Sequence, residues 1–264
     1  MTSATTPLLD VRHLCRSFGG LKAVDDVCLD IREGEIVALI GPNGAGKTTC
    51  FNLVTGADRP TSGEVLLDGA SVCRWPAWRV AQAGVGRTFQ NIRLFKEMTA
   101  LDNVRTPRAF RAGYGPLAAI LRTRKFRAAE AEHARRATEL LELVGLAGMA
   151  QARARELPYG AQRRLEIARA LALEPRLLLL DEPAAGMNPS EKADLAALVR
   201  RLRDDLRLTV LLIEHDMSFV MGLSDRIYVL DHGEPIANGT PAEVRANPRV
   251  IEAYLGAPAA SEPT

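Results

Sequence analysis

The feature that most constrains this chain is a glycine-rich segment at residues 41–48, which reads GPNGAGKT. It matches in full the pattern G-x-x-x-x-G-K-[ST], in which backbone N–H groups surround phosphate groups. Residues 35–40 before it form a short apolar run, which predicts a strand buried in a parallel sheet. Residues 50–54 after it place apolar side chains at helical spacing. This order of strand, glycine loop and helix is the context that phosphate binding requires, and it disfavours a ligand-free glycine turn.

Within this loop, the glycines allow a tight turn and the helix N-terminus favours an anion. We expect Lys47 to reach the terminal phosphates of a nucleotide and the Thr48 hydroxyl to bind Mg²⁺. The expected nucleotide-binding residues of the loop are Gly41, Pro42, Asn43, Gly44, Ala45, Gly46, Lys47, Thr48 and Thr49.

A second apolar run at residues 176–180 ends in Asp181 and Glu182, and prolines at 175 and 183 bracket it as a short strand. Two carboxylates after a buried strand are costly unless a cation is near. A bound Mg²⁺ would supply that cation for Asp181, which leaves Glu182 to orient or deprotonate an attacking water. The alternative, an acidic pair facing solvent, is disfavoured because the same chain carries the phosphate loop.

Together with Gln90, the segment LPYGAQ at residues 157–162 and His215, these motifs resemble those of the ATP-binding cassette (ABC) ATPases over nearly the whole chain. The resemblance implies ATP and Mg²⁺ as cofactors and ATP hydrolysis as the activity. It implies an adenine-stacking ring at Phe18, a Mg²⁺ and water ligand at Gln90, a γ-phosphate switch at His215, and contacts to a second subunit's nucleotide from Tyr159, Gly160 and Gln162. Two residues depart from the family pattern: Pro158 stands for the signature serine and Asn188 for an aspartate.

The family fold is an α/β P-loop NTPase cassette, with a RecA-like parallel-sheet core, an antiparallel β edge lobe and an inserted helical subdomain. We expect the cassette at residues 7–256, the helical subdomain near 92–165 and a disordered tail at 257–264. Alternating apolar residues at 8–14 and 27–31 predict the edge lobe. Trp75 and Trp78 are expected beneath it. Leu94 and Phe95 fit either a helical core or a groove that receives a permease.

A closer resemblance is to the ATP-binding subunits of branched-chain amino-acid importers, the LivG-like group. It is carried by residues 18–24, 87–95, 159–169, 213–217 and 253–256. This resemblance implies a second ABC subunit, identical or different, two membrane permeases and, indirectly, a periplasmic binding protein. It also implies a peripheral location on the cytoplasmic face of the inner membrane. Urea import, lipopolysaccharide export and a non-transport ABC ATPase remain as alternatives.

Composition excludes some classes of function. The net charge of +2 argues against a nucleic-acid partner. The four cysteines show no C-x-x-C spacing, so spacing predicts neither a zinc site nor a disulfide framework. No apolar run approaches 18 residues, so a membrane association is expected to come through a partner.

Overall fold

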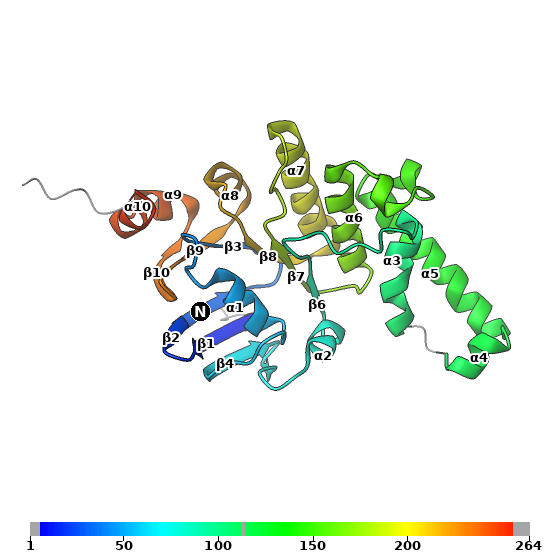
Figure 1. Ribbon diagram of the computed structural model, residues 1–264, viewed down its shortest axis with the longest axis horizontal. Coiled ribbons are helices and arrows are strands. Elements are labelled where there is room, and N and C mark those ends of the chain that lie inside the picture. Colours follow the sequence, from blue (N-terminus) through cyan, green and yellow to red (C-terminus); the bar gives the residue numbers. More distant parts are fainter. Residues whose placement is uncertain (1–5, 112–113, 256–264) are drawn as a thin grey trace, which may run out of the picture. The chain divides into compact units, whose positions relative to one another are not determined.

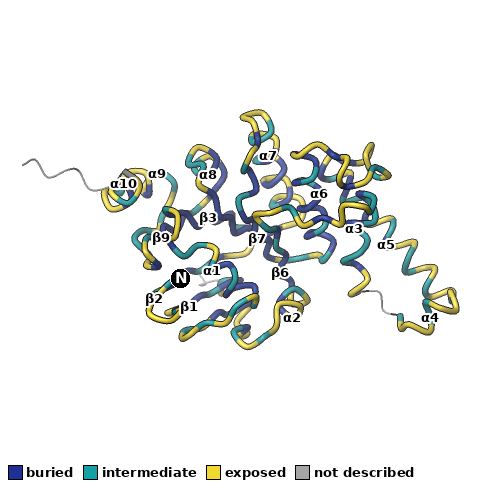
Figure 2. The backbone as a smooth tube through the Cα atoms, viewed as in Figure 1, coloured by how far each residue is buried: buried dark blue, intermediate teal, exposed yellow. Residues whose placement is uncertain are grey.

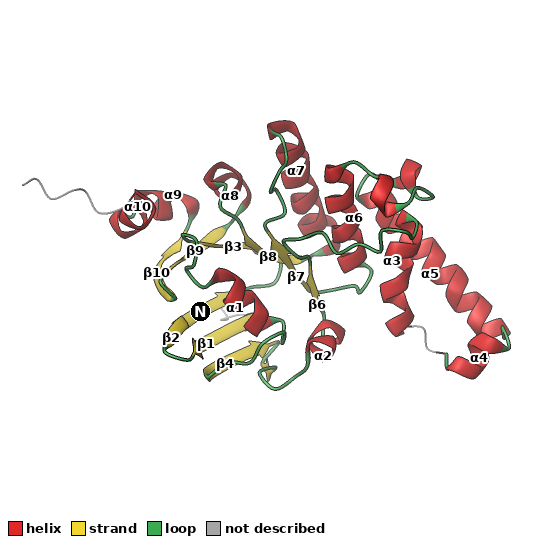
Figure 3. Cartoon of the chain, in the orientation of Figure 1, coloured by secondary structure: helices red, strands yellow, loops and turns green. Residues whose placement is uncertain are grey.

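The computed structural model describes residues 6–111 and 114–255, and the predicted tail at 257–264 lies outside them. The chain divides into two units, Met1–Arg87 with Arg176–Thr264, and Thr88–Pro175. The first unit carries two sheets with their helices, and the second is helical (Figures 1 and 3).

The larger sheet of the first unit has six strands in the order β10-β9-β3-β8-β7-β6. Its strands are β3 (Ile36–Ile40), β6 (Val85–Arg87), β7 (Leu177–Asp181), β8 (Thr209–Ile213), β9 (Arg226–Asp231) and β10 (Glu234–Gly239). All neighbours are parallel except β9 and β10, which form an antiparallel pair. Every residue of β3, β7 and β8 is buried, as expected for parallel strands that are apolar apart from Thr209 at the start of β8 and Asp181 at the end of β7. The predicted parallel core is therefore confirmed.

The second sheet is antiparallel, with the order β2-β1-β4-β5. Its strands are β1 (Leu9–Phe18), β2 (Leu21–Ile31), β4 (Ser62–Leu67) and β5 (Ala70–Ser71). Leu9, Val11 and Leu14 of β1 are buried in one hydrophobic cluster with Val37 and Leu39 of β3. The buried residues appear as dark segments of both sheets in Figure 2. The predicted edge lobe is confirmed, because alternating apolar residues place one face on the core.

Six helices belong to the described part of the first unit: α1 (Lys47–Val54), α2 (Ala77–Gln82), α7 (Pro189–Leu206), α8 (Met217–Leu223), α9 (Pro241–Ala246) and α10 (Pro248–Leu255). A capping box begins α7, in which the side chains of Asn188 and Glu191 each accept a hydrogen bond from the other's backbone N–H. One tryptophan prediction is wrong. Trp75 packs against the hydrophobic cluster, whereas Trp78 is 60% exposed on α2.

The second unit contains α3 (Ala100–Arg108), α4 (Pro116–Ile120), α5 (Arg124–Leu143) and α6 (Tyr159–Leu171), with 3₁₀ turns at Ala109–Arg111, Ala147–Met149 and Ala154–Glu156. Buried apolar residues of α3, α5 and α6 form its core, among them Val104, Leu141 and Leu165. Residues 105–115 carry no clear periodicity, yet α3 extends to Arg108. Its buried Asn103 stabilises the start of this helix, because its side-chain amide donates to the carbonyl oxygens of Phe95 and Thr99.

Candidate nucleotide-binding site

The glycine loop joins β3 to α1, as its sequence predicts, and two of its glycines are required by close backbone approaches. A Cβ at Gly41 would lie 2.0 Å from the Leu230 carbonyl oxygen, and one at Gly46 would lie 2.2 Å from that of Ala23. Both have positive φ, 152° and 95°. Gly46 is also the N-cap of α1 and offers no side-chain cap. The first N–H groups of α1 are therefore left for an anion.

Lys47 lies folded into this loop. Its Nζ donates to the carbonyl oxygens of Gly41 at 2.7 Å and Pro42 at 2.8 Å. Burial lowers the pKa of Lys47, whereas the negative charges of Glu182 and Asp181 oppose that shift. The ammonium group is thus held by two backbone carbonyl oxygens, which phosphate oxygens could replace.

Three parallel strands bring the other predicted first-unit residues to one edge of the sheet. β8 lies between β3 and β7, and Asp181 at the end of β7 is paired with Ile213 at the end of β8. The Glu182 N–H donates to the Ile213 carbonyl at 2.9 Å. His215 Nδ1 then lies 3.8 Å from Glu182 Oε1. The backbone of Glu182 has φ 48°, a conformation that non-glycine residues seldom adopt and that is frequent at functional sites.

The structure gives Asp181 a cationic partner that sequence reasoning missed. Arg87 Nη2 donates to Asp181 Oδ2 at 3.0 Å, and the two side chains are only 10% and 4% exposed. Arg87 Nη1 also donates to Asn52 Oδ1 at 2.8 Å and Thr55 Oγ1 at 3.2 Å. Arg87 ends the short strand β6, which pairs with β7. An arginine at the end of a short strand was the sequence signal that could have predicted this ion pair. The protein itself therefore supplies a cation for Asp181, a role that the sequence had assigned to a bound Mg²⁺.

Glu214 is a second missed residue. It is buried, and burial raises its pKa. Its Oε1 accepts from the Ala184 N–H at 2.7 Å and its Oε2 from the His215 N–H at 3.2 Å. Glu214 thus connects the segment after β7 to His215. An acidic residue at the end of an apolar strand was the signal that could have found it.

Phe18 ends β1, where it pairs with Leu21 of β2. Its side chain is 48% exposed, and the guanidinium carbon of Arg16 lies 4.4 Å from its ring centroid. Two residues beyond Leu21, Ala23 lies against Gly46 of the glycine loop. The β1–β2 hairpin therefore carries an accessible aromatic ring on the strand pair that contacts the loop.

The remaining predicted residues belong to the second unit, where Arg163 of α6 connects two of them. Its Nη2 donates to the Gln90 carbonyl at 2.6 Å and to the Tyr159 hydroxyl at 3.0 Å. Gly160 is buried in the first turn of α6, and the Gln162 side chain donates to the Leu157 carbonyl at 2.8 Å. Pro158 is the N-cap of α6.

Leu94 and Phe95 differ in how far their side chains are exposed to solvent. Leu94 is buried, which fits the core alternative, whereas Phe95 is 48% exposed. The Phe95 backbone is fixed by Asn103, whose Oδ1 accepts from its N–H at 2.9 Å. Phe95 therefore presents an apolar ring to solvent from a hydrogen-bonded backbone.

Comparison with known proteins identifies the family of this chain. A family model described as ABC transporter matches residues 24–185, and one described as branched-chain amino acid ATP-binding cassette transporter matches residues 234–260. The chain is 51% identical to the high-affinity branched-chain amino acid transport ATP-binding protein LivG of Salmonella typhimurium, over 95% of this chain and 98% of that protein. It is 50% identical to BraF of Pseudomonas aeruginosa over the same shares.

Solved structures agree. The ADP conformation of MJ1267, an ATP-binding cassette of an ABC transporter, superposes with a TM-score of 0.83 at 31% identity, over 96% of this chain and 100% of that one. The dimeric cassette MJ0796 superposes with a TM-score of 0.75 at 27% identity, over 88% and 98%. No helix within residues 6–111 and 114–255 is long and apolar enough to cross a membrane. The chain has the glycine loop, and Asp181 and Glu182 follow a neighbouring strand of the same sheet. Together with these similarities, this shows that the chain belongs to the ABC transporter family, as a nucleotide-binding ABC-type ATPase.

Proposed function

We propose that this chain hydrolyses ATP to energise the uptake of branched-chain amino acids through separate permease subunits. The observation that carries this proposal is the 51% identity to LivG over 95% of the chain. The family model at residues 234–260 supports the same substrate class. We infer a peripheral place on the cytoplasmic face of the inner membrane, beside two permeases that take substrate from a periplasmic binding protein.

For hydrolysis, Glu182 is the proposed proton acceptor for the attacking water. Its carboxylate follows a fully buried strand, and His215 lies 3.8 Å away on the neighbouring strand. His215 orients Glu182 and contacts the terminal phosphate. Lys47 exchanges its two carbonyl partners for phosphate oxygens, so its charge stabilises the phosphates. Phe18 stacks on the adenine with its exposed ring.

The residues of the loop fit Mg²⁺, which prefers oxygen ligands. The Thr48 hydroxyl is exposed in the first turn of α1, and Asp181 offers a carboxylate at the end of β7. Thr48 and Asp181, with Gln90 as implied by the family resemblance, would hold the ion. When bound, Mg²⁺ neutralises charge on the β- and γ-phosphates. Arg87 holds Asp181 in place for this role.

We further propose that two cassettes act as a pair. Tyr159, Gly160 and Gln162 begin α6, where N–H groups are available to the γ-phosphate held by the other subunit. Pro158 fixes the entry to that helix without a hydroxyl. The dimeric MJ0796 cassette supports the pairing of two cassettes. As the family resemblance implies, the partner cassette is proposed to be a similar second subunit.

The test is transport in proteoliposomes that contain this chain, its two permeases and its partner cassette, with the binding protein added. Leucine, isoleucine or valine should stimulate ATP hydrolysis and accumulate inside the vesicles. Stimulation by urea alone, or ATP hydrolysis that no branched-chain amino acid affects, would overturn the substrate assignment.

Recruitment to the permeases is tested through Phe95. We propose that the exposed Phe95 ring contacts an apolar surface of the permease. Phe95→Asp would bury a charge in that contact, so it should abolish co-sedimentation with permease-containing membranes while leaving ATP binding intact. The matched control is Phe110→Asp, since Phe110 is an exposed phenylalanine elsewhere in the same unit. Equal recruitment of both variants would contradict docking at Phe95.

A further inference from the structure

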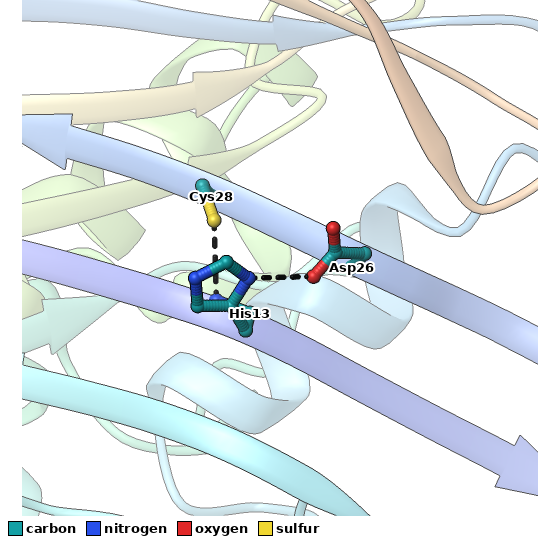
Figure 4. Close-up of side chains that lie close together, drawn as sticks. All are labelled: His13, Asp26 and Cys28. Carbon is teal, nitrogen blue, oxygen red and sulfur yellow. Dashed lines mark hydrogen bonds and ion pairs between the residues drawn. The ribbon is translucent and has the colours of Figure 1, made fainter.

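Three side chains outside the nucleotide site converge on the antiparallel sheet: His13 from β1, and Asp26 and Cys28 from β2 (Figure 4). All three are exposed, and one ligand atom from each lies within 4.8 Å of the other two. His13 Nδ1 lies 2.8 Å from Asp26 Oδ1. The His13 N–H donates to Cys28 Sγ at 3.2 Å.

Irregular strand pairing produces this cluster. Val11 pairs with Leu29 and Leu14 with Val27, so two residues of β1, Arg12 and His13, stand opposite the single residue Cys28. Such a bulge changes the direction of a side chain. His13 has φ 48° and Asp26 φ 53°, both rare for non-glycine residues. Asp26 and Cys28 are two residues apart on one strand and so share a face. The backbone therefore holds the three donors near one point.

The donor set has a chemical preference. Thiolate and imidazole select zinc and similar transition metals, whereas Mg²⁺ and Ca²⁺ prefer oxygen ligands. Within the described chain, no lysine or arginine forms an ion pair with Asp26, and its recorded partner is His13. The cluster thus offers a cation the Asp26 carboxylate, which no lysine or arginine among the described residues neutralises, and the Cys28 sulfur.

We propose that His13, Asp26 and Cys28 bind a zinc ion, with a fourth position open to water. The ion would join β1 to β2 directly across the bulge. It is separate from the Mg²⁺ of the nucleotide, because its ligands include sulfur and lie on the other sheet. Zinc therefore stabilises the hairpin whose far end carries Phe18.

The proposal is tested on the full chain after removal of metals with a chelator. Zinc should bind at one ion per chain in a competition titration, and Co²⁺ should show a thiolate charge-transfer band. Cys28→Ser should remove that band and weaken zinc binding by at least about ten-fold, because even the loss of an outer contact to a metal ligand costs that much. His13→Gln and Asp26→Asn should weaken binding too. Cys73→Ser is the control, since Cys73 lies outside the cluster with its sulfur accepting from the Val65 N–H.

A second readout needs no variant. Cys28 is exposed and Cys50 is fully buried, so alkylation followed by peptide mapping should modify Cys28 readily and Cys50 hardly at all. Zinc should slow the alkylation of Cys28 specifically. Unchanged alkylation in saturating zinc, or zinc affinity in Cys28→Ser equal to that of the unmodified chain, would overturn the site.

Discussion

Arg87→Met tests whether the buried ion pair between Arg87 and Asp181 stabilises the first unit. Methionine keeps a long apolar side chain but removes the charge and the donors to Asp181, Asn52 and Thr55. Asp181, whose side chain is 4% exposed, then loses this cationic partner. Breaking a buried pair in this way costs about 3–5 kcal/mol of unfolding free energy. The midpoint of urea denaturation, measured without nucleotide, should fall accordingly while the slope is unchanged.

Two comparisons make this prediction specific. Arg12→Met removes the exposed pair with Asp10, whose side chains are 59% and 20% exposed, and should cost less than about 1 kcal/mol. Adding Asp181→Asn to Arg87→Met should recover part of the loss, because the buried carboxylate charge is then gone as well. If Arg87→Met costs no more than Arg12→Met, or if the double variant recovers nothing, the pair does not act as argued.

Three further predictions concern the mechanism and pH dependence. Glu182→Gln should leave ATP binding intact while turnover of the complete complex falls on the order of 10²–10⁴-fold, and turnover within a few-fold of the unmodified complex would exclude Glu182 as the base. Gly160→Val should abolish ATP-induced pairing of cassettes, seen by size-exclusion chromatography, whereas Pro158→Ser should retain it; retention in both would contradict the proposed contact across subunits. The pKa of Asp216 is lowered by hydrogen bonds from Lys192 and Ser218, so its contribution to stability is present above the unfolded-state pKa of about 4 and is lost as pH falls below that value. Asp216→Asn should therefore flatten the acid-side decline in unfolding free energy, and an identical decline in both proteins would refute this linkage.

Sequence reasoning located the chemical motifs because each is local. The glycine loop, the Asp181–Glu182 pair and His215 are each defined by a few neighbouring residues after an apolar strand. Parallel strands end at a common edge, so three such strands predict that these residues approach one another, and the observed order β3-β8-β7 fulfils this. The fold class follows from the same local periodicities.

Arg87 and Glu214 escaped prediction because their roles depend on partners far along the chain. Arg87 is 94 residues from Asp181, and Glu214 is 30 residues from Ala184. Their sequence neighbourhoods show only a charged residue at a strand end. Trp78 was misplaced for the converse reason: an apolar side chain favours burial, but α2 directs this one to solvent.

The sequence by itself determined what the chain can bind, because a phosphate loop needs its glycines, lysine and threonine in one fixed order. Only the tertiary structure decided which charges meet. Strand pairing sets Arg87 against Asp181, and a single extra residue in β1 brings His13 to Cys28 and Asp26, although cysteine spacing predicted no zinc site. Contacts of this kind depend on register across strands, and a shift of one residue would direct the same side chains elsewhere.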